Sequence, residues 1–156
     1  MSKKQASLVQ ISVSNGGVPK LPVRTAKVGI QGVQGDRQRS TDIHGGPERA
    51  VCLFSLEVID ALRQEGHSIF PGASGENLTI TGLDWNEVKP GRRLKVGEVR
   101  LEIMSYTAPC LQNMQWFSDG DVSCISQKKH PGSSRIYAKV LTEGMVAVGD
   151  AVVLER

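Results

Sequence analysis

Hydrophobic and polar residues alternate along several short stretches of this chain. Val99, Leu101 and Ile103 alternate with Arg100 and Glu102 after a turn at 97–98, which predicts a strand with one buried face. The same reasoning places Val9, Ile11 and Val13 on one face of an early strand. Further strands are predicted at 50–54, 78–80, 137–141 and 151–154.

One segment has helical spacing instead. Ser55 suits an N-cap, Leu56, Ile59 and Leu62 recur at helical intervals, and Gly66 suits the end of the helix. The 17 glycines among 156 residues indicate many turns. We therefore expect a mainly β (α+β) fold, a β-barrel of short strands with one or a few peripheral helices, since closure removes sheet edges.

Composition narrows the class of protein. The length suits a single domain over residues 1–156, and the net charge of +3 permits an anionic ligand. We do not expect binding to nucleic acid, because no block of five Lys or Arg occurs and aromatics are few. No apolar run is long enough for a membrane span, and no signal peptide is expected at the start. Three widely spaced cysteines indicate a reducing, cytoplasmic compartment.

Cys110 is the leading candidate for chemistry. It lies in a loop just after the predicted strand at 99–103, where Pro109 interrupts strand pairing. A thiolate there can act as a soft metal ligand or as a nucleophile, and the alternative is a small hydrophobic residue filling a gap. Cys52, within an apolar run, is expected to be structural, and the role of Cys124 stays open.

Three loops are candidates for binding an anion. The turn at 44–47, close to Arg37 and Arg39, exposes backbone N–H groups that can form a nest. The glycine loop 72–77 lacks the Gly-Lys-Ser/Thr sequence that ends a nucleotide-binding phosphate loop. The loop 128–135 combines cations and hydroxyl groups that can hold a phosphate. For the turn at 44–47 and the loop 128–135, the alternative is an ordinary solvated loop.

Four ordered blocks of the chain resemble the MOSC family, the domain found at the C-terminal end of molybdenum-cofactor sulfurases and in free-standing relatives. The blocks are Gly35-Asp36-Arg37-Gln38 with Asp42-Ile43-His44-Gly45-Gly46-Pro47 and Ala50-Val51; Gly75-Glu76-Asn77-Leu78-Thr79-Ile80 with Gly82-Leu83-Asp84-Trp85; Pro109-Cys110; and Tyr137-Ala138-Lys139-Val140-Leu141 with Gly144 and Gly149-Asp150. One departure stands out: many relatives have an Arg shortly before the Pro-Cys pair, where this chain has Tyr106-Thr107-Ala108.

The resemblance implies a β-barrel-rich fold and one functional cysteine, here Cys110. In family members that are enzymes, the equivalent thiolate ligates molybdenum in a pterin cofactor, and these enzymes reduce N-hydroxylated compounds. Other members are proposed to carry sulfur for metal–sulfur cluster assembly. The anionic molybdenum cofactor (molybdopterin) requires phosphate-binding loops and cations besides the soft ligand. The residues expected to bind it are His44, Gly45, Gly46, Arg37, Glu76, Asn77 and Arg135, with Cys110 on the metal.

Three hypotheses about function follow. The first is a molybdenum-dependent reductase of N-hydroxylated or N-oxygenated small molecules, which takes electrons from a separate donor protein. The second is a sulfur carrier that forms a persulfide on Cys110, supplied by a cysteine desulfurase. The third is a non-catalytic barrel that binds an anion or a partner. Trp116 and Phe117 fit a dimer surface, a substrate wall or a small satellite core equally well.

Overall fold

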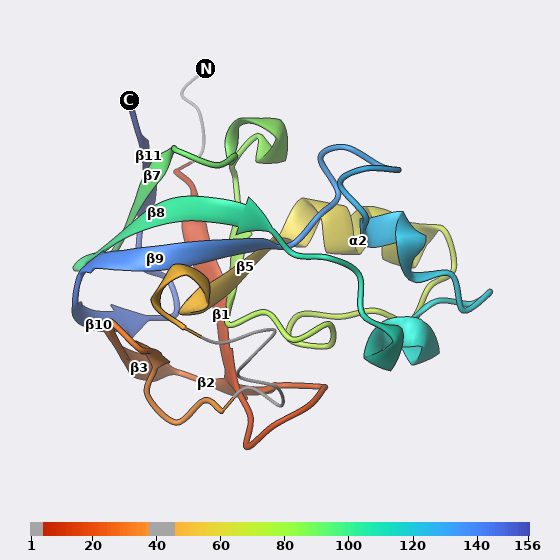
Figure 1. The fold of residues 1–156 in the computed structure, drawn as a ribbon, viewed down its shortest axis with the longest axis horizontal. Helices are drawn as coiled ribbons and strands as arrows, with labels where there is room; N and C mark the ends of the chain where they lie inside the picture. Colours follow the sequence, from red (N-terminus) through yellow and green to blue (C-terminus); the bar gives the residue numbers. More distant parts are fainter. Residues whose placement is uncertain (1–4, 38–45) are drawn as a thin grey trace.

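The computed structural model describes residues 5–37 and 46–156, and it places curved β-sheets beside a smaller helical region (Figure 1). The strands are β1 (Ser7–Val13), β2 (Leu21–Val23), β3 (Thr25–Gly29), β4 (Gly32–Val33), β5 (Val51–Ser55), β6 (Leu78–Thr81), β7 (Arg93–Val96), β8 (Val99–Tyr106), β9 (Ile136–Thr142), β10 (Gly144–Ala147) and β11 (Val152–Glu155). The helices are α2 (Leu56–Gln64) and the 3₁₀ segments η1 (Pro47–Arg49), η2 (Trp85–Glu87), η3 (Leu111–Trp116) and η4 (Val122–Ile125).

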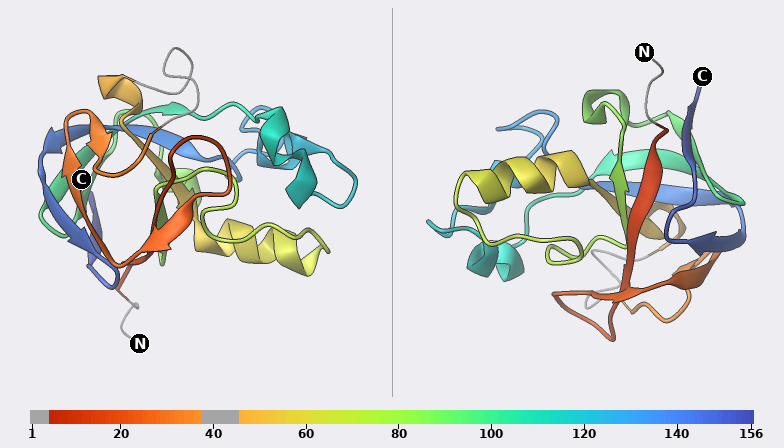
Figure 2. Two further views of the ribbon diagram at one scale, coloured as in Figure 1. Left: turned by 90° about the horizontal axis from the view of Figure 1, so that it is seen from below. Right: turned by 180° about the vertical axis from the view of Figure 1, so that it is seen from behind.

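Eight strands form one sheet in the order β11-β7-β8-β9-β5-β6-β1-β2, and β10-β3-β4 form a second, smaller sheet. The β5–β6 pair is parallel, because α2 and a long loop connect these two strands. Figure 2 shows the sheets curving around a common interior while α2, η3 and η4 lie to one side. The expected mainly β class is thus confirmed.

The expected closure of a barrel is not found. The strand order of the large sheet keeps two ends, β11 and β2. The curvature does bring the β11 end back to β1, where a single bridge joins Ser7 to Ala151 and the Leu8 N–H donates to the Asp150 carbonyl at 2.9 Å. This contact covers residues 6–8, and from Ile11 onward β1 pairs with β2 instead.

The predicted elements are present with small shifts at their ends. α2 begins after Ser55, whose hydroxyl accepts a hydrogen bond from the Val58 N–H at 3.3 Å, and Gly66 beyond its end has a φ of 100°. Strand β1 differs in detail from its alternating pattern, because its register with β6 shifts between Leu8 and Gln10. The bulge buries Leu8 and Ile11, whereas Val9 is only half-buried.

Two hydrophobic clusters stabilise the molecule. The larger cluster fills the space enclosed by the sheets. The smaller cluster packs Phe54 and Ile59 against Phe117, with Trp116 and Cys124 at its margin. Of the three roles considered for Trp116 and Phe117, the structure supports the satellite core.

In the described part of the chain, no helix has the length and apolar character needed to cross a membrane. All three cysteines are free thiols; Cys52 is buried, and Cys110 and Cys124 are half-buried.

Candidate functional site

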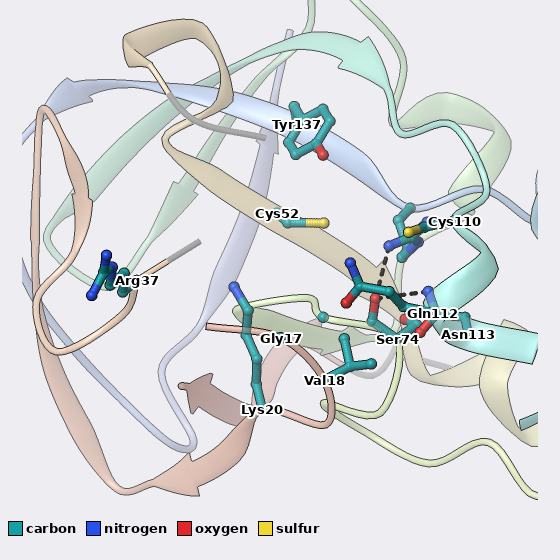
Figure 3. Close-up of a pocket in the computed structure, with 12 residues that line it drawn as sticks. Gly17, Val18, Lys20, Arg37, Cys52, Ser74, Cys110, Gln112, Asn113 and Tyr137 are labelled. Carbon is teal, nitrogen blue, oxygen red and sulfur yellow. Dashed lines mark hydrogen bonds between the residues drawn. The ribbon is translucent and has the colours of Figure 1, made fainter. Parts of the chain in front are cut away.

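A cavity of about 60 Å³ lies where the paired strands β5 and β9 meet several connecting segments of the chain (Figure 3). Its lining comes from segments far apart in the sequence: Gly17, Val18, Lys20, Arg37, Cys52, Ser74, Gly75, Cys110, Gln112, Asn113, Arg135 and Tyr137. Three of the residues singled out from the sequence, Arg37, Cys110 and Arg135, therefore meet at one cavity.

Cys110 is placed at this cavity by the end of β8. The backbone leaves the sheet after Tyr106, and the Thr107 N–H donates to the Arg135 carbonyl at 2.9 Å. Cys110 is then extended, with φ −118° and ψ 137°, and serves as the N-cap of η3. The thiol is thus fixed at the rim of the sheet while remaining partly exposed, as expected from its strand-end position.

Arg135 is a buried cation that holds the loop of Cys110. Its Nη1 donates to the Ser74 carbonyl at 2.8 Å and its Nη2 to the Ala108 carbonyl at 3.1 Å, and the residue is only 4% exposed. Within residues 5–37 and 46–156, no carboxylate pairs with this guanidinium, and its Nε has no hydrogen-bond partner. Arg135, which directly precedes β9, therefore places a cation beside the loop of Cys110.

Asn113 contributes a second unpartnered polar atom. Its Nδ2 donates to the same Ser74 carbonyl at 3.1 Å, while its Oδ1 is buried without a partner among the described residues. Leaving a buried polar atom unpaired costs about 1–3 kcal/mol. A site that offers a buried donor on Arg135 and a buried acceptor on Asn113 beside one cavity is chemically suited to a polar ligand.

Lys20 is a lining cation that the sequence pattern did not indicate. Its Nζ lies 2.8 Å from Asp36 Oδ2, and both side chains are nearly buried. Asp36 also accepts from the Ser14 N–H and from Asn77 Nδ2, each at 2.9 Å. This network fixes the segment that ends at Arg37, whose side chain is exposed at the cavity.

Glu76 and Asn77 are not among the cavity-lining residues. Glu76 accepts hydrogen bonds from the Gly72 N–H, the Ser74 hydroxyl and the Thr79 hydroxyl, each at 3.0 Å, and burial raises the pKa of its carboxyl group. Asn77 accepts from the Cys52 N–H at 3.0 Å and donates to the Ser12 carbonyl and to Asp36. Both residues shape the walls behind the cavity.

The predicted nest is only partly described. His44, Gly45 and Arg39 lie outside the described residues. Gly46 is exposed, precedes η1 and does not line the cavity. Arg49, at the end of η1, stacks over the ring of Tyr137 at 5.7 Å from its centroid, which connects this segment to the cavity wall.

Cys52 and Tyr137 face each other across β5 and β9 and both line the cavity. Burial raises the pKa of the Cys52 thiol, and its Sγ lies 3.8 Å from Thr107 Oγ1. Burial also raises the pKa of Tyr137 to about 12. Cys52 was expected to be structural; it is indeed buried among apolar neighbours, and it also borders the candidate site.

The loop 128–135 does not act as one anion-binding unit. Arg135 belongs to the cavity of Cys110, whereas His130, Gly132 and Ser133 line a separate cavity of about 440 Å³ between α2, η2 and this loop. Cys124 and the carboxylates of Glu57 and Glu65 also line that second cavity.

The residues at the first cavity fit the donor chemistry of a molybdenum cofactor. They combine one partly exposed thiol with the cations Lys20, Arg37 and Arg135 and two unpartnered polar atoms. Pockets that enclose a whole organic ligand usually exceed about 300 Å³. A cavity of about 60 Å³ could therefore hold the metal end of the molybdenum cofactor, and the rest of the cofactor would extend beyond the described cavity.

Comparison with known proteins identifies the family of the chain. The model of the MOSC domain matches residues 40–153. The uncharacterized protein YflK of Bacillus subtilis is 28% identical over 135 residues, which are 85% of this chain and 60% of YflK. Protein YiiM of Escherichia coli is 28% identical over 100 residues, which are 62% of this chain and 45% of YiiM.

The chain therefore spans about 60% and 45% of the lengths of these two relatives. Among solved structures, the YUAD protein of Bacillus subtilis shares the fold with a TM-score of 0.75 at 18% identity, covering 96% of this chain and 94% of that one. Because the family model spans most of the sequence, the chain belongs to the MOSC domain family.

Proposed function

We propose that this protein binds the molybdenum cofactor with Cys110 on the metal and reduces N-hydroxylated or N-oxygenated small molecules. The observation that carries the proposal is the partly exposed Cys110 thiol in a cavity that also receives cationic side chains. A thiolate is a soft ligand, and cations suit the phosphate and oxo groups of an anionic cofactor.

Each lining residue has a defined task in this proposal. Cys110 would hold the metal, Arg37 and Lys20 would contact anionic groups, and the Arg135 Nε–H and Asn113 Oδ1 would meet polar edges of the bound group. The cofactor, when bound, supplies two-electron redox chemistry at the N–O bond. The roles first considered for His44, Gly45, Gly46, Glu76 and Asn77 as cofactor contacts remain part of the proposal to be tested.

Substitution of the thiol tests this proposal. In protein produced in a host that makes the cofactor, we expect molybdenum in the wild type and at least about a 10-fold loss in Cys110→Ser, because the metal loses the thiolate ligand that this proposal assigns to it. Cys124→Ser is the matched control, since this half-buried thiol lies outside the cavity and should leave the metal content unchanged. A wild type without molybdenum, or Cys110→Ser with full content, would disprove the assignment.

A persulfide on Cys110 is the second candidate, and the presence of another thiol, Cys52, in the same cavity favours it. Incubation with a cysteine desulfurase and cysteine would then add one sulfur atom to Cys110 in intact protein that holds no molybdenum. A non-catalytic anion-binding protein would instead be indifferent to Cys110→Ser and would lose anion binding on charge reversal at Arg37.

A further inference from the structure

We propose that Tyr137 is the catalytic proton donor of this site, delivering a proton to the oxygen that leaves when the N–O bond is broken. This inference rests on the proposed function and deepens it. It assigns a role to a cavity residue that has neither a metal-ligand nor an anion-binding function.

The reaction itself requires protons from the site. Reduction of R–NH–OH by two electrons and two protons gives R–NH₂ and water: the N–O bond breaks, one proton joins nitrogen, and one joins the departing oxygen. The electrons come from a separate reductase of the flavin or iron–sulfur class. Protonating the oxygen as it leaves avoids the formation of free hydroxide, so an acid positioned at the cavity wall accelerates this step.

Position singles out Tyr137 among the lining groups. It lies on β9 directly opposite Cys52 of β5, and Figure 3 shows its hydroxyl directed toward the cavity that Cys110 also borders. The backbone of β9 and the stacked Arg49 guanidinium hold its ring in place. A molecule held at Cys110 in so small a cavity therefore meets a fixed O–H group.

The other protic lining groups are less suited to this task. Lys20 is engaged in a buried ion pair with Asp36, and the Ser74 hydroxyl donates to Glu76. The two terminal nitrogens of Arg135 donate to the Ser74 and Ala108 carbonyls. Tyr137 stays protonated at neutral pH because burial disfavours its phenolate, and water reaching the cavity mouth can restore its proton after each turnover.

Tyr137→Phe tests the inference, and the chain provides a matched control. Tyr106 is the only other tyrosine, is 37% exposed and lies outside the cavity, so Tyr106→Phe makes the same chemical change elsewhere. Each variant is loaded with cofactor, its molybdenum content is measured, and turnover of an N-hydroxylated amidine is followed with a chemical reductant in place of the partner.

We expect Tyr137→Phe to keep its molybdenum and its KM while kcat falls about 100-fold or more, with a reduced solvent deuterium isotope effect. Tyr106→Phe should match the wild type. Equal kcat in Tyr137→Phe and wild type, at equal molybdenum content, would overturn the role of Tyr137 and leave the proposed function standing. Absence of molybdenum from the wild type would overturn both.

A second measurement covers the case in which Tyr137→Phe fails to fold. In the Tyr106→Phe background, fluorotyrosine incorporation labels Tyr137 alone and makes its phenol more acidic. If Tyr137 donates the proton, kcat rises with the acidity of the phenol while it remains protonated. A kcat that does not respond to the fluorine substituent contradicts the inference.

Discussion

Glu76 illustrates how one residue links the cavity to the stability of the protein. Its carboxyl group is buried and accepts hydrogen bonds from Gly72 and Ser74 of the loop that presents Ser74 and from Thr79 of β6. These bonds offset part of the desolvation cost, yet burial still raises its pKa above the ordinary value of 4.5. The folded protein therefore binds the Glu76 proton more tightly than the unfolded chain does.

This difference predicts a pH dependence. Since the folded-state pKa is raised, the contribution of Glu76 to stability is complete below pH 4.5 and is lost as the pH rises through the folded-state value. Glu76→Gln removes the titration and can still accept from the Gly72 N–H and the Thr79 hydroxyl at one oxygen. The free energy of unfolding of wild type relative to Glu76→Gln should therefore decrease from pH 4.5 upward.

Urea unfolding at a series of pH values measures this decrease. Glu48→Gln makes the same chemical change at an exposed residue and is the matched variant for comparison. A constant difference between wild type and Glu76→Gln from pH 4.5 to neutral pH would show that burial does not perturb this carboxyl group.

At the scale of single residues, the sequence predicted the chemical types of the site better than its geometry. Arg37, Cys110 and Arg135 do border one cavity, and two of them, Cys110 and Arg135, flank strands that the hydrophobic pattern located. The pattern cannot say which way a side chain in a loop points, so Glu76 and Asn77 could not be assigned to the interior. Lys20 lies in a segment without periodicity, and only tertiary contact with Asp36 brings it to the cavity.

Among the elements, α2 shows how a side-chain hydrogen bond determines the residue at which a helix begins. The Ser55 hydroxyl caps the helix by accepting from the Val58 N–H, and residues 51–55 just before it form the central strand β5. The cap thus marks the change from strand to helix at a residue that is itself buried. The helix was predictable because spacing, cap and terminal glycine all agreed.

Removing this cap should weaken the protein. Ser55→Ala leaves the Val58 N–H without its side-chain partner, and we expect the free energy of unfolding to fall by about 1 kcal/mol. Chemical denaturation measures the change. Ser68→Ala, at an exposed serine outside any helix, should stay within about 0.5 kcal/mol of the wild type. Equal effects at the two serines would exclude a capping role for Ser55.

Strand β1 shows the limit of pattern reasoning at this scale. Its alternation predicted a strand correctly, yet the bulge between Leu8 and Gln10 moves Leu8 into the core and leaves Val9 half-exposed. A bulge depends on the partner strand and on the curvature of the sheet. Neither can be predicted from the alternation of residues within one strand.

For the whole molecule, the order of strands predicts a gradient of stability. Strand β9 lies between β8 and β5 in the middle of the large sheet, whereas β2 ends the sheet with three residues, of which Leu21 is 64% exposed. Opening β2 breaks few contacts, while opening β9 disrupts the core that β8 and β5 share with it.

Native-state hydrogen exchange should show this gradient. Backbone amides of β9 should exchange only through global unfolding and follow the free energy of unfolding as denaturant is added. Amides of β2 should exchange much faster and respond weakly to denaturant. Equal protection of β2 and β9 would mean that the sheet opens as one cooperative unit up to its edge.

The cavity is lined by segments that lie far apart in the sequence, so the site forms only when these segments have folded together. Residues 17–20, 52, 74–75, 110–113 and 135–137 become neighbours only after β9 has joined the sheet. A nascent chain that stops short of β9 offers a guest molecule no complete binding surface. A ligand must therefore bind to the folded protein. Its binding free energy then adds to the free energy of unfolding, because the unfolded chain has no such site.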